Sequence, residues 1–218
     1  MPTHLAVLAV AAAAVAGQNP SLLRVGLLQG VQDQPPTPLP LFHNDRKALL
    51  QYWRRPDNLL AYAIPIQAAQ QQPPPQNWLI IEDFAWLCQL LARFPLIQLP
   101  EYTVLNVLHQ NNRTHQLLDL TWLAARREVV HTLYSDLTVG PQLTARHYRS
   151  MLTHQTWHCT RQWVGAGAWR IALSTFMLGL RTFTIFNTRE LLYTLFYALR
   201  TYSCCWGGKR KVGAPPSR

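Results

Sequence analysis

Apolar residues recur at helical spacing through most of the chain after residue 77. Ile80, Phe84, Leu87 and Leu91, for example, follow one another at intervals of four, three and four residues. This spacing places the four side chains on one face of a helix. Similar patterns, ended by Pro or Gly, predict helices over residues 43–52, 78–94, 100–109, 115–137, 144–164, 168–183 and 187–202.

The last two predicted helices, 168–183 and 187–202, are apolar on nearly every side and are joined by a short turn. Arginines interrupt both of them, which argues against a membrane span. A helix that is apolar all round is expected at the centre of a bundle. No alternating run of apolar and polar residues is long enough to predict a sheet. We therefore predict an all-α fold, a multi-helix bundle around a central apolar helical hairpin.

Pro-rich and Gln-rich stretches divide the chain. Residues 18–41 contain four prolines near their end and no helical period, and residues 67–76 read QAAQQQPPPQ. Both compositions are typical of extended connectors. The predicted divisions are an apolar and Pro-rich arm (1–41), a first helix region (42–66), a Gln/Pro linker (67–77), a helical bundle core (78–205) and a basic disordered tail (206–218).

Composition favours a binding protein with a basic surface. Only 14% of the 218 residues are charged while 11% are aromatic, so much surface must be buried or must form an apolar binding face. The net charge of +10 would attract an anionic partner, such as nucleic acid or an acidic membrane surface. The arginines are dispersed, however, and the only dense basic run is Lys209-Arg210-Lys211.

Nucleic-acid binding is one of two alternatives to a protein partner. In a basic nuclear accessory protein, Trp157 or Trp163 could stack on bases. Phosphate contacts would come from Arg126, Arg127, Arg146, Arg149, Arg161, Lys209, Arg210 and Lys211. The other alternative is a structural or assembly protein.

Nothing in the sequence indicates an enzyme or a cofactor. It contains neither a phosphate-binding Gly loop nor a Gly-x-Ser-x-Gly elbow. Cys159 follows His158, but neighbouring residues on a helix point about 100° apart and do not form a hydrogen-bonded dyad. We expect no catalytic residue and no cofactor.

A zinc site is the one metal hypothesis that the sequence suggests. His147, His154 and His158 lie on nearly one face of a predicted helix, and Cys159 or the pair Cys204-Cys205 could add thiolates. Structural zinc sites usually have more closely spaced ligands. A half-exposed, His-rich surface is the simpler interpretation, so no metal is expected.

The N-terminus leaves two localisations open. Residues 5–16 form an apolar run, and Ala14-Val15-Ala16-Gly17 resembles a signal-peptide cleavage site, but no Lys or Arg precedes the run. The run is too short to span a bilayer. The four cysteines do not form a disulfide framework. We expect an intracellular protein, cytoplasmic or nuclear, with secretion through this run as the alternative.

Three stretches resemble motifs of the Bcl-2-like apoptosis regulators, including the divergent viral members of that family. Residues 44–53 (NDRKALLQYW) are similar to the family's first-helix motif. Residues 123–130 (LAARREVV) resemble its death-motif helix, and residues 167–171 (GAWRI), running into Phe176 and Gly179, resemble the motif that opens its central helix.

The resemblance implies a helical bundle that binds an amphipathic partner helix in a surface groove. It implies that the partner would be a helix of a host cell-death regulator and that the chain would be a viral accessory protein. The residues that the resemblance assigns to partner binding are Leu123, Glu128, Val130, Trp169, Arg170 and Phe176. Peripheral membrane contact by the apolar hairpin is a further expectation.

Overall fold

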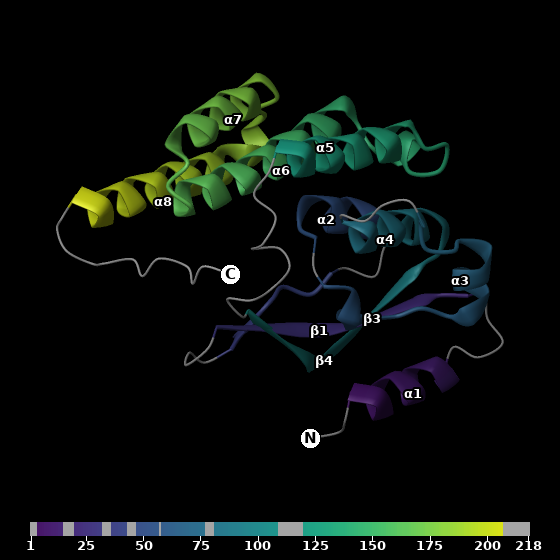
Figure 1. The fold of residues 1–218 in the computed structure, drawn as a ribbon. Coiled ribbons are helices and arrows are strands. Elements are labelled where there is room, and N and C mark those ends of the chain that lie inside the picture. The colour runs from purple at the N-terminus through teal and green to yellow at the C-terminus, as the bar shows by residue number, and fades with distance from the viewer. Residues whose placement is uncertain are drawn as a thin grey trace, which may run out of the picture. The chain divides into compact units, whose positions relative to one another are not determined.

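The computed structural model describes residues 4–14, 20–31, 36–42, 47–56, 58–76, 81–108 and 120–206. The chain forms two compact units, residues 1–152 and residues 153–218 (Figure 1). The described residues are mainly helical, as predicted, but the first unit also contains a sheet of four strands. The fold is therefore not all-α.

The sheet of the first unit is built around strand β1 (Leu22–Val31). Strand β4 (Leu96–Leu108) pairs parallel to β1 along its whole length. The short strands β2 (Thr37–Pro38) and β3 (Tyr62–Ala63) pair antiparallel to the two halves of β1. Since a strand has two edges, β2 and β3 share the edge of β1 opposite β4.

Burial on both faces explains why β1 was not predicted. Consecutive residues from Ser21 to Leu27 are buried, so the strand has no alternation of apolar and polar positions. Figure 1 shows helix α1 (His4–Ala14) on one side of the sheet and helices α2 (Ala48–Arg54) and α4 (Glu82–Arg93) on the other. The N-terminal stretch predicted as an arm and a connector thus supplies a helix and the central strand.

The helix predicted over residues 100–109 is wrong, because most of this stretch belongs to β4. Pro100 and Glu101 suit the first turn of a helix, but here they occupy an irregularity in the strand. Arg24 is opposite Gln98 and Gly26 is opposite Tyr102, so three residues of β4 face one residue of β1. Such a bulge accommodates a proline inside a strand.

The predicted linker does not separate the compact units. Helix α3 (Ile66–Gln71) begins one residue before the predicted linker and covers its first half, and it buries Ala68 in the core of the first unit. The Trp86 indole donates a hydrogen bond of 2.7 Å to the Gln72 carbonyl, which ties this segment to α4. The division between units instead falls between Leu152 and Thr153, inside helix α6 (Ala145–Gly165).

Five of the predicted helices are confirmed with shifted ends. Helix α4 lies within 78–94, helix α5 (Leu120–Ser135) within 115–137, and α6 matches 144–164. Helices α7 (Trp169–Arg181) and α8 (Thr188–Trp206) match the predicted hairpin. Residues 43–46, at the start of the predicted first helix, lie outside the described residues, and α2 begins at Ala48. Of the predicted tail, only Trp206 is described, at the end of α8.

The second unit consists of the later part of α6, α7, the short turn η4 (Ile185–Asn187) and α8. Gly167, at φ 74°, connects α6 to α7 in the left-handed conformation that glycine adopts most easily. The prediction that the α7–α8 hairpin is buried at the centre of a bundle is wrong. Several of its largest apolar side chains are exposed.

Candidate protein-binding face

Two pairs of threonine hydroxyls join α6 to α7 in the second unit. Thr160 Oγ1 of α6 lies 3.1 Å from Thr175 Oγ1 of α7, and Thr153 Oγ1 lies 2.9 Å from Thr182 Oγ1. All these hydroxyls belong to side chains that are buried or half-buried, and each has a hydrogen-bond partner, as buried polar groups require. Hydroxyl pairs therefore join α6 to the hairpin where leucines would do so in an ordinary bundle.

A glycine allows α7 to approach α6 closely. The Trp157 indole of α6 is buried and donates a hydrogen bond of 3.2 Å to the Phe176 carbonyl of α7. Its Nε1 occupies the space where a Cβ on Gly179 would be, 2.2 Å away. The aromatic ring of Phe176 stacks on the same indole, with 5.7 Å between ring centres.

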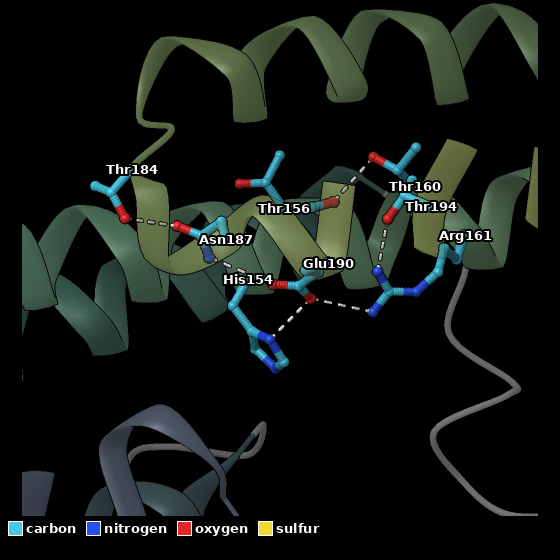
Figure 2. A network of polar contacts seen from close by, with 8 residues as sticks. All are labelled: His154, Thr156, Thr160, Arg161, Thr184, Asn187, Glu190 and Thr194. Carbon is cyan, nitrogen blue, oxygen red and sulfur yellow. Dashed lines mark hydrogen bonds and ion pairs between the residues drawn. The ribbon is translucent and has the colours of Figure 1, made fainter. Parts of the chain in front are cut away.

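A network of charged and polar groups centred on Glu190 joins α8 to α6 (Figure 2). One carboxylate oxygen lies 2.8 Å from His154 Nδ1 and 3.3 Å from Arg161 Nη2. The other oxygen accepts a hydrogen bond of 3.4 Å from Asn187 Nδ2. Arg161 also donates to Thr194 Oγ1 over 2.8 Å. The Glu190 side chain is only 16% exposed, so these partners replace water around its charge.

The network sets the pKa of Glu190. Burial alone would raise this pKa, but the hydrogen bond and charge of His154, together with the charge of Arg161 and the Asn187 hydrogen bond, lower it to about 2. Glu190 is therefore ionised at neutral pH. Asn187 and Glu190 have the three-residue spacing of a capping box, and here they interact through their side chains.

The outer surface of the hairpin has the opposite character. Leu173 on α7 and Leu192, Phe196 and Leu199 on α8 are 63–67% exposed. Other exposed apolar side chains of the second unit are Ile171, Met177, Phe183, Ile185, Phe186, Tyr193, Leu195 and Tyr202. By contrast, every residue classed as buried in the described part of 168–206 is small or polar, namely Ala172, Thr175, Gly179, Asn187 and Thr194. The hairpin thus turns mainly small and polar residues inward, while most of its large apolar side chains are exposed. We call this exposed outer side the apolar face.

Four exposed arginines accompany the apolar face. Arg170 and Arg181 are eleven residues apart on α7, and Arg189 and Arg200 are eleven apart on α8. Eleven residues are close to three helical turns, so each pair lies on one side of its helix. Among the described residues, none of the four arginines has a carboxylate within ion-pair distance. Glu190 is the only acidic residue from residue 137 to residue 218, against eleven Lys and Arg.

The partner-binding residues predicted from the resemblance fall into both units. On α7, Arg170 is exposed and the Trp169 ring packs edge-on against Tyr202, 5.9 Å between centres. On α5, in the first unit, Leu123 and Val130 are buried and Glu128 is exposed. Val130 is part of the hydrophobic core, so its side chain already packs against other residues of the chain. Neither unit by itself brings all of these residues together.

The predicted nucleic-acid residues are also dispersed. Arg126 is buried with its guanidinium 4.0 Å above the Trp122 ring, and burial lowers the pKa of the half-buried Arg127, although Tyr148 acts against this. Arg161 is bound to Glu190, while Arg146 and Arg149 are exposed. Lys209, Arg210 and Lys211 lie outside the described residues. The indoles of Trp157 and Trp163 are buried, so the prediction that they stack on bases is wrong.

The histidines of the zinc hypothesis have separate environments. His147 Nε2 lies 3.0 Å from Arg54 Nη2 and His147 Nδ1 lies 3.0 Å from Thr144 Oγ1, whereas His154 pairs with Glu190. Burial, with the charges of Arg54 and Arg146, lowers the pKa of His147. In the described part of the chain, no three His, Cys, Asp or Glu side chains are grouped as a metal site requires.

The apolar face was missed because helical periodicity shows that a helix has an apolar side without showing where that side points. One signal was available in the sequence. Residues 137–218 contain a single acidic residue, so few carboxylates are present to pair with the arginines of this stretch. The exposed arginine pairs on α7 and α8 agree with this.

The chain matches no family model, no curated protein and no solved structure. No helix in the described ranges has both the length and the apolarity needed to cross a bilayer.

Proposed function

We propose that this chain is a non-enzymatic interaction protein that binds an amphipathic helix of another protein on the apolar face of α7 and α8. The observation that carries the proposal is the outward direction of the leucines, at positions where the inward side is small or polar. Apolar patches of this kind usually mark interaction sites. Helix α8 repeats its exposed apolar residues at Leu192, Leu195 or Phe196, and Leu199, which is the spacing at which two helices pack.

The energetics are adequate for a transient or stable complex. Burying one large apolar side chain contributes roughly 1.5–3 kcal/mol. Association costs at least about 4 kcal/mol in lost freedom. Six to eight such side chains would contribute roughly 9–24 kcal/mol, so a micromolar Kd, about −8 kcal/mol, lies within the range of this balance.

A labelled amphipathic peptide tests the proposal. The probe has about 18 residues, leucines on one face and glutamines on the other, so that it forms a helix when bound. We expect micromolar binding to the full chain by fluorescence anisotropy, and at least tenfold weaker binding to Leu192→Asp. The control is Leu137→Asp, because Leu137 is 92% exposed in the first unit and outside the apolar face. Absence of peptide binding, or equal weakening in both variants, would contradict the proposal.

The Bcl-2-like resemblance makes a narrower proposal of the same kind. In that case the partner is the death-motif helix of a cell-death regulator. A peptide carrying that motif should then bind more tightly than the Leu/Gln peptide, and Trp169→Ala should weaken it. If the two peptides bind equally, the apolar face is a general helix-binding surface and the resemblance gives no guide to the partner.

Nucleic-acid binding remains the second candidate, and the exposed Arg146 and Arg149 of α6 support it. They are three residues apart, so they lie on one side of the helix. A single-stranded oligonucleotide should then bind with an affinity that falls steeply with salt, and Arg146→Gln with Arg149→Gln should reduce that slope. For an assembly protein, light scattering at two concentrations should instead show a mass that grows with concentration.

A further inference from the structure

The apolar face has a definite position between its arginine pairs. On α7, Trp169, Leu173 and Met177 follow one another at intervals of four and lie along one side of the helix. On α8, Leu195, Leu199 and Tyr202 follow at intervals of four and three and also lie along one side. Because the Trp169 ring contacts the Tyr202 ring, these two sides adjoin. Apolar rows therefore run along both helices where α7 and α8 meet.

The arginines come next around each helix. At 100° per residue, Arg170 and Arg181 lie beyond Met177 on the side away from Trp169. By the same count, Arg189 and Arg200 lie beyond Phe196 on the side away from Tyr202. The order across the hairpin is arginine, apolar, apolar, arginine. A helix that lies along the apolar rows would have a pair of arginines on each of its flanks.

These arginines lack a counter-charge within the second unit. Its only carboxylate, Glu190, faces inward and is bound by His154 and Arg161. A second copy of the chain would bring four more arginines to the same face, and like charges oppose such pairing. The complementary partner carries carboxylates on both edges of an apolar stripe.

We infer that the partner of the apolar face is an acidic amphipathic helix, whose apolar stripe packs on α7 and α8 while its Asp and Glu side chains pair with Arg170, Arg181, Arg189 and Arg200. This inference rests on the proposed function and specifies the chemistry of the partner. Electrostatic complementarity of this kind selects among helices that share the same apolar stripe.

Three peptides with one leucine face and a polar face of Glu, Gln or Lys test the inference on the full chain. We expect the Glu peptide to bind at least tenfold more tightly than the Lys peptide at low salt, with the Gln peptide between them. The difference should shrink at 0.5 M salt, since salt screens exposed charges. In a chain with Arg181→Gln and Arg189→Gln, the preference for Glu should fall at least threefold while binding of the Gln peptide stays the same. Exchanging Arg146 and Arg149 for Gln is the matched control and should leave the preference intact.

The outcomes separate the two levels of the proposal. If all three peptides bind equally, the partner is not selected by charge and the inference is overturned, while the proposed function stands. If none binds, the proposed function is overturned and the inference with it. Vesicles of phosphatidylcholine with phosphatidylserine form a further arm. If these vesicles bind the chain and displace the Glu peptide and the Lys peptide equally well, the apolar face recognises a lipid surface, and the inference is again overturned.

Discussion

The indole nitrogen of Trp157 lies in the space that any side chain at position 179 would need. A Cβ built on Gly179 would be 2.2 Å from Nε1 and 2.5 Å from Cδ1 of that ring. The indole is buried and is fixed by its hydrogen bond to the Phe176 carbonyl and by the Phe176 and Phe183 rings. Helices α6 and α7 can therefore lie this close together only because position 179 has no side chain.

We predict that Gly179→Ala destabilises the second unit by about 1–3 kcal/mol, the usual cost of overpacking. The loss should appear in urea unfolding followed by near-UV circular dichroism, which reports the packing of buried aromatic side chains, Trp157 among them. Ser174→Ala is the control, because Ser174 is exposed on the same helix. If Gly179→Ala is as stable as the control, the close packing of Trp157 on α7 is not present in solution.

Acid should weaken the second unit through Glu190. Its pKa is lowered from 4.5 to about 2, so its contribution is complete above pH 4.5 and is lost as the pH falls toward 2. The shift corresponds to about 3 kcal/mol. The free energy of unfolding should therefore fall more steeply between pH 5 and pH 2.5 in the original chain than in Glu190→Gln. Parallel pH profiles for the two proteins would argue against an ionised Glu190 held by His154 and Arg161.

We expect the stability of the first unit to depend on pH through His147, in a higher pH range than for Glu190. The positive Arg54 guanidinium lies 3.0 Å from Nε2 of His147, and a charge so close disfavours protonation of the ring. Its pKa is lowered by burial and by the charges of Arg54 and Arg146. As the pH falls below 6.5, the unfolded chain binds a proton that the folded chain does not, and stability decreases by at most about 1.4 kcal/mol per pH unit. Denaturant unfolding from pH 7.5 to 5 should show this fall, and His147→Gln should remove it.

Gly26 is the corresponding close approach in the sheet. A Cβ there would lie 2.6 Å from the Tyr102 ring on the paired strand. We predict that Gly26→Ala lowers the melting temperature of the chain, and that the loss is smaller when Tyr102→Ala is already present. Such non-additivity is expected of residues in direct contact. A fully additive pair would show that the two positions do not touch.

The sequence predicts the helices well but not the sheet. Helices α4, α5, α6, α7 and α8 have apolar spacing and Pro or Gly at their ends, and these signals are local. Strand β1 is buried on both faces, so the pattern that distinguishes a strand from a loop is missing. Strand β4 contains Pro100, which reads as a helix start until the bulge opposite Val25 is known.

The apolar face shows a second limit of sequence reasoning. The leucines at 192, 195 and 199 have the spacing of core residues, and the threonines at 194 and 201 have the spacing of a solvent face. The structure reverses this order for Thr194, which is buried, while the leucines are exposed. Only tertiary contacts, such as those of Glu190 and Thr194 with Arg161, determine which side faces α6.

The parallel pairing of β1 with β4 imposes a delay while the chain is being made. Leu22 pairs with Leu96, so 74 residues must be added before this part of the strand meets its partner. At roughly 5–20 residues per second, a ribosome needs about 4 to 15 seconds for that. During this interval β1 is a hydrophobic segment whose long edge toward β4 is unpaired. Chaperones protect segments of this kind from aggregation. A nascent chain halted before residue 96 should therefore be held by such chaperones, and release should follow once β4 has emerged.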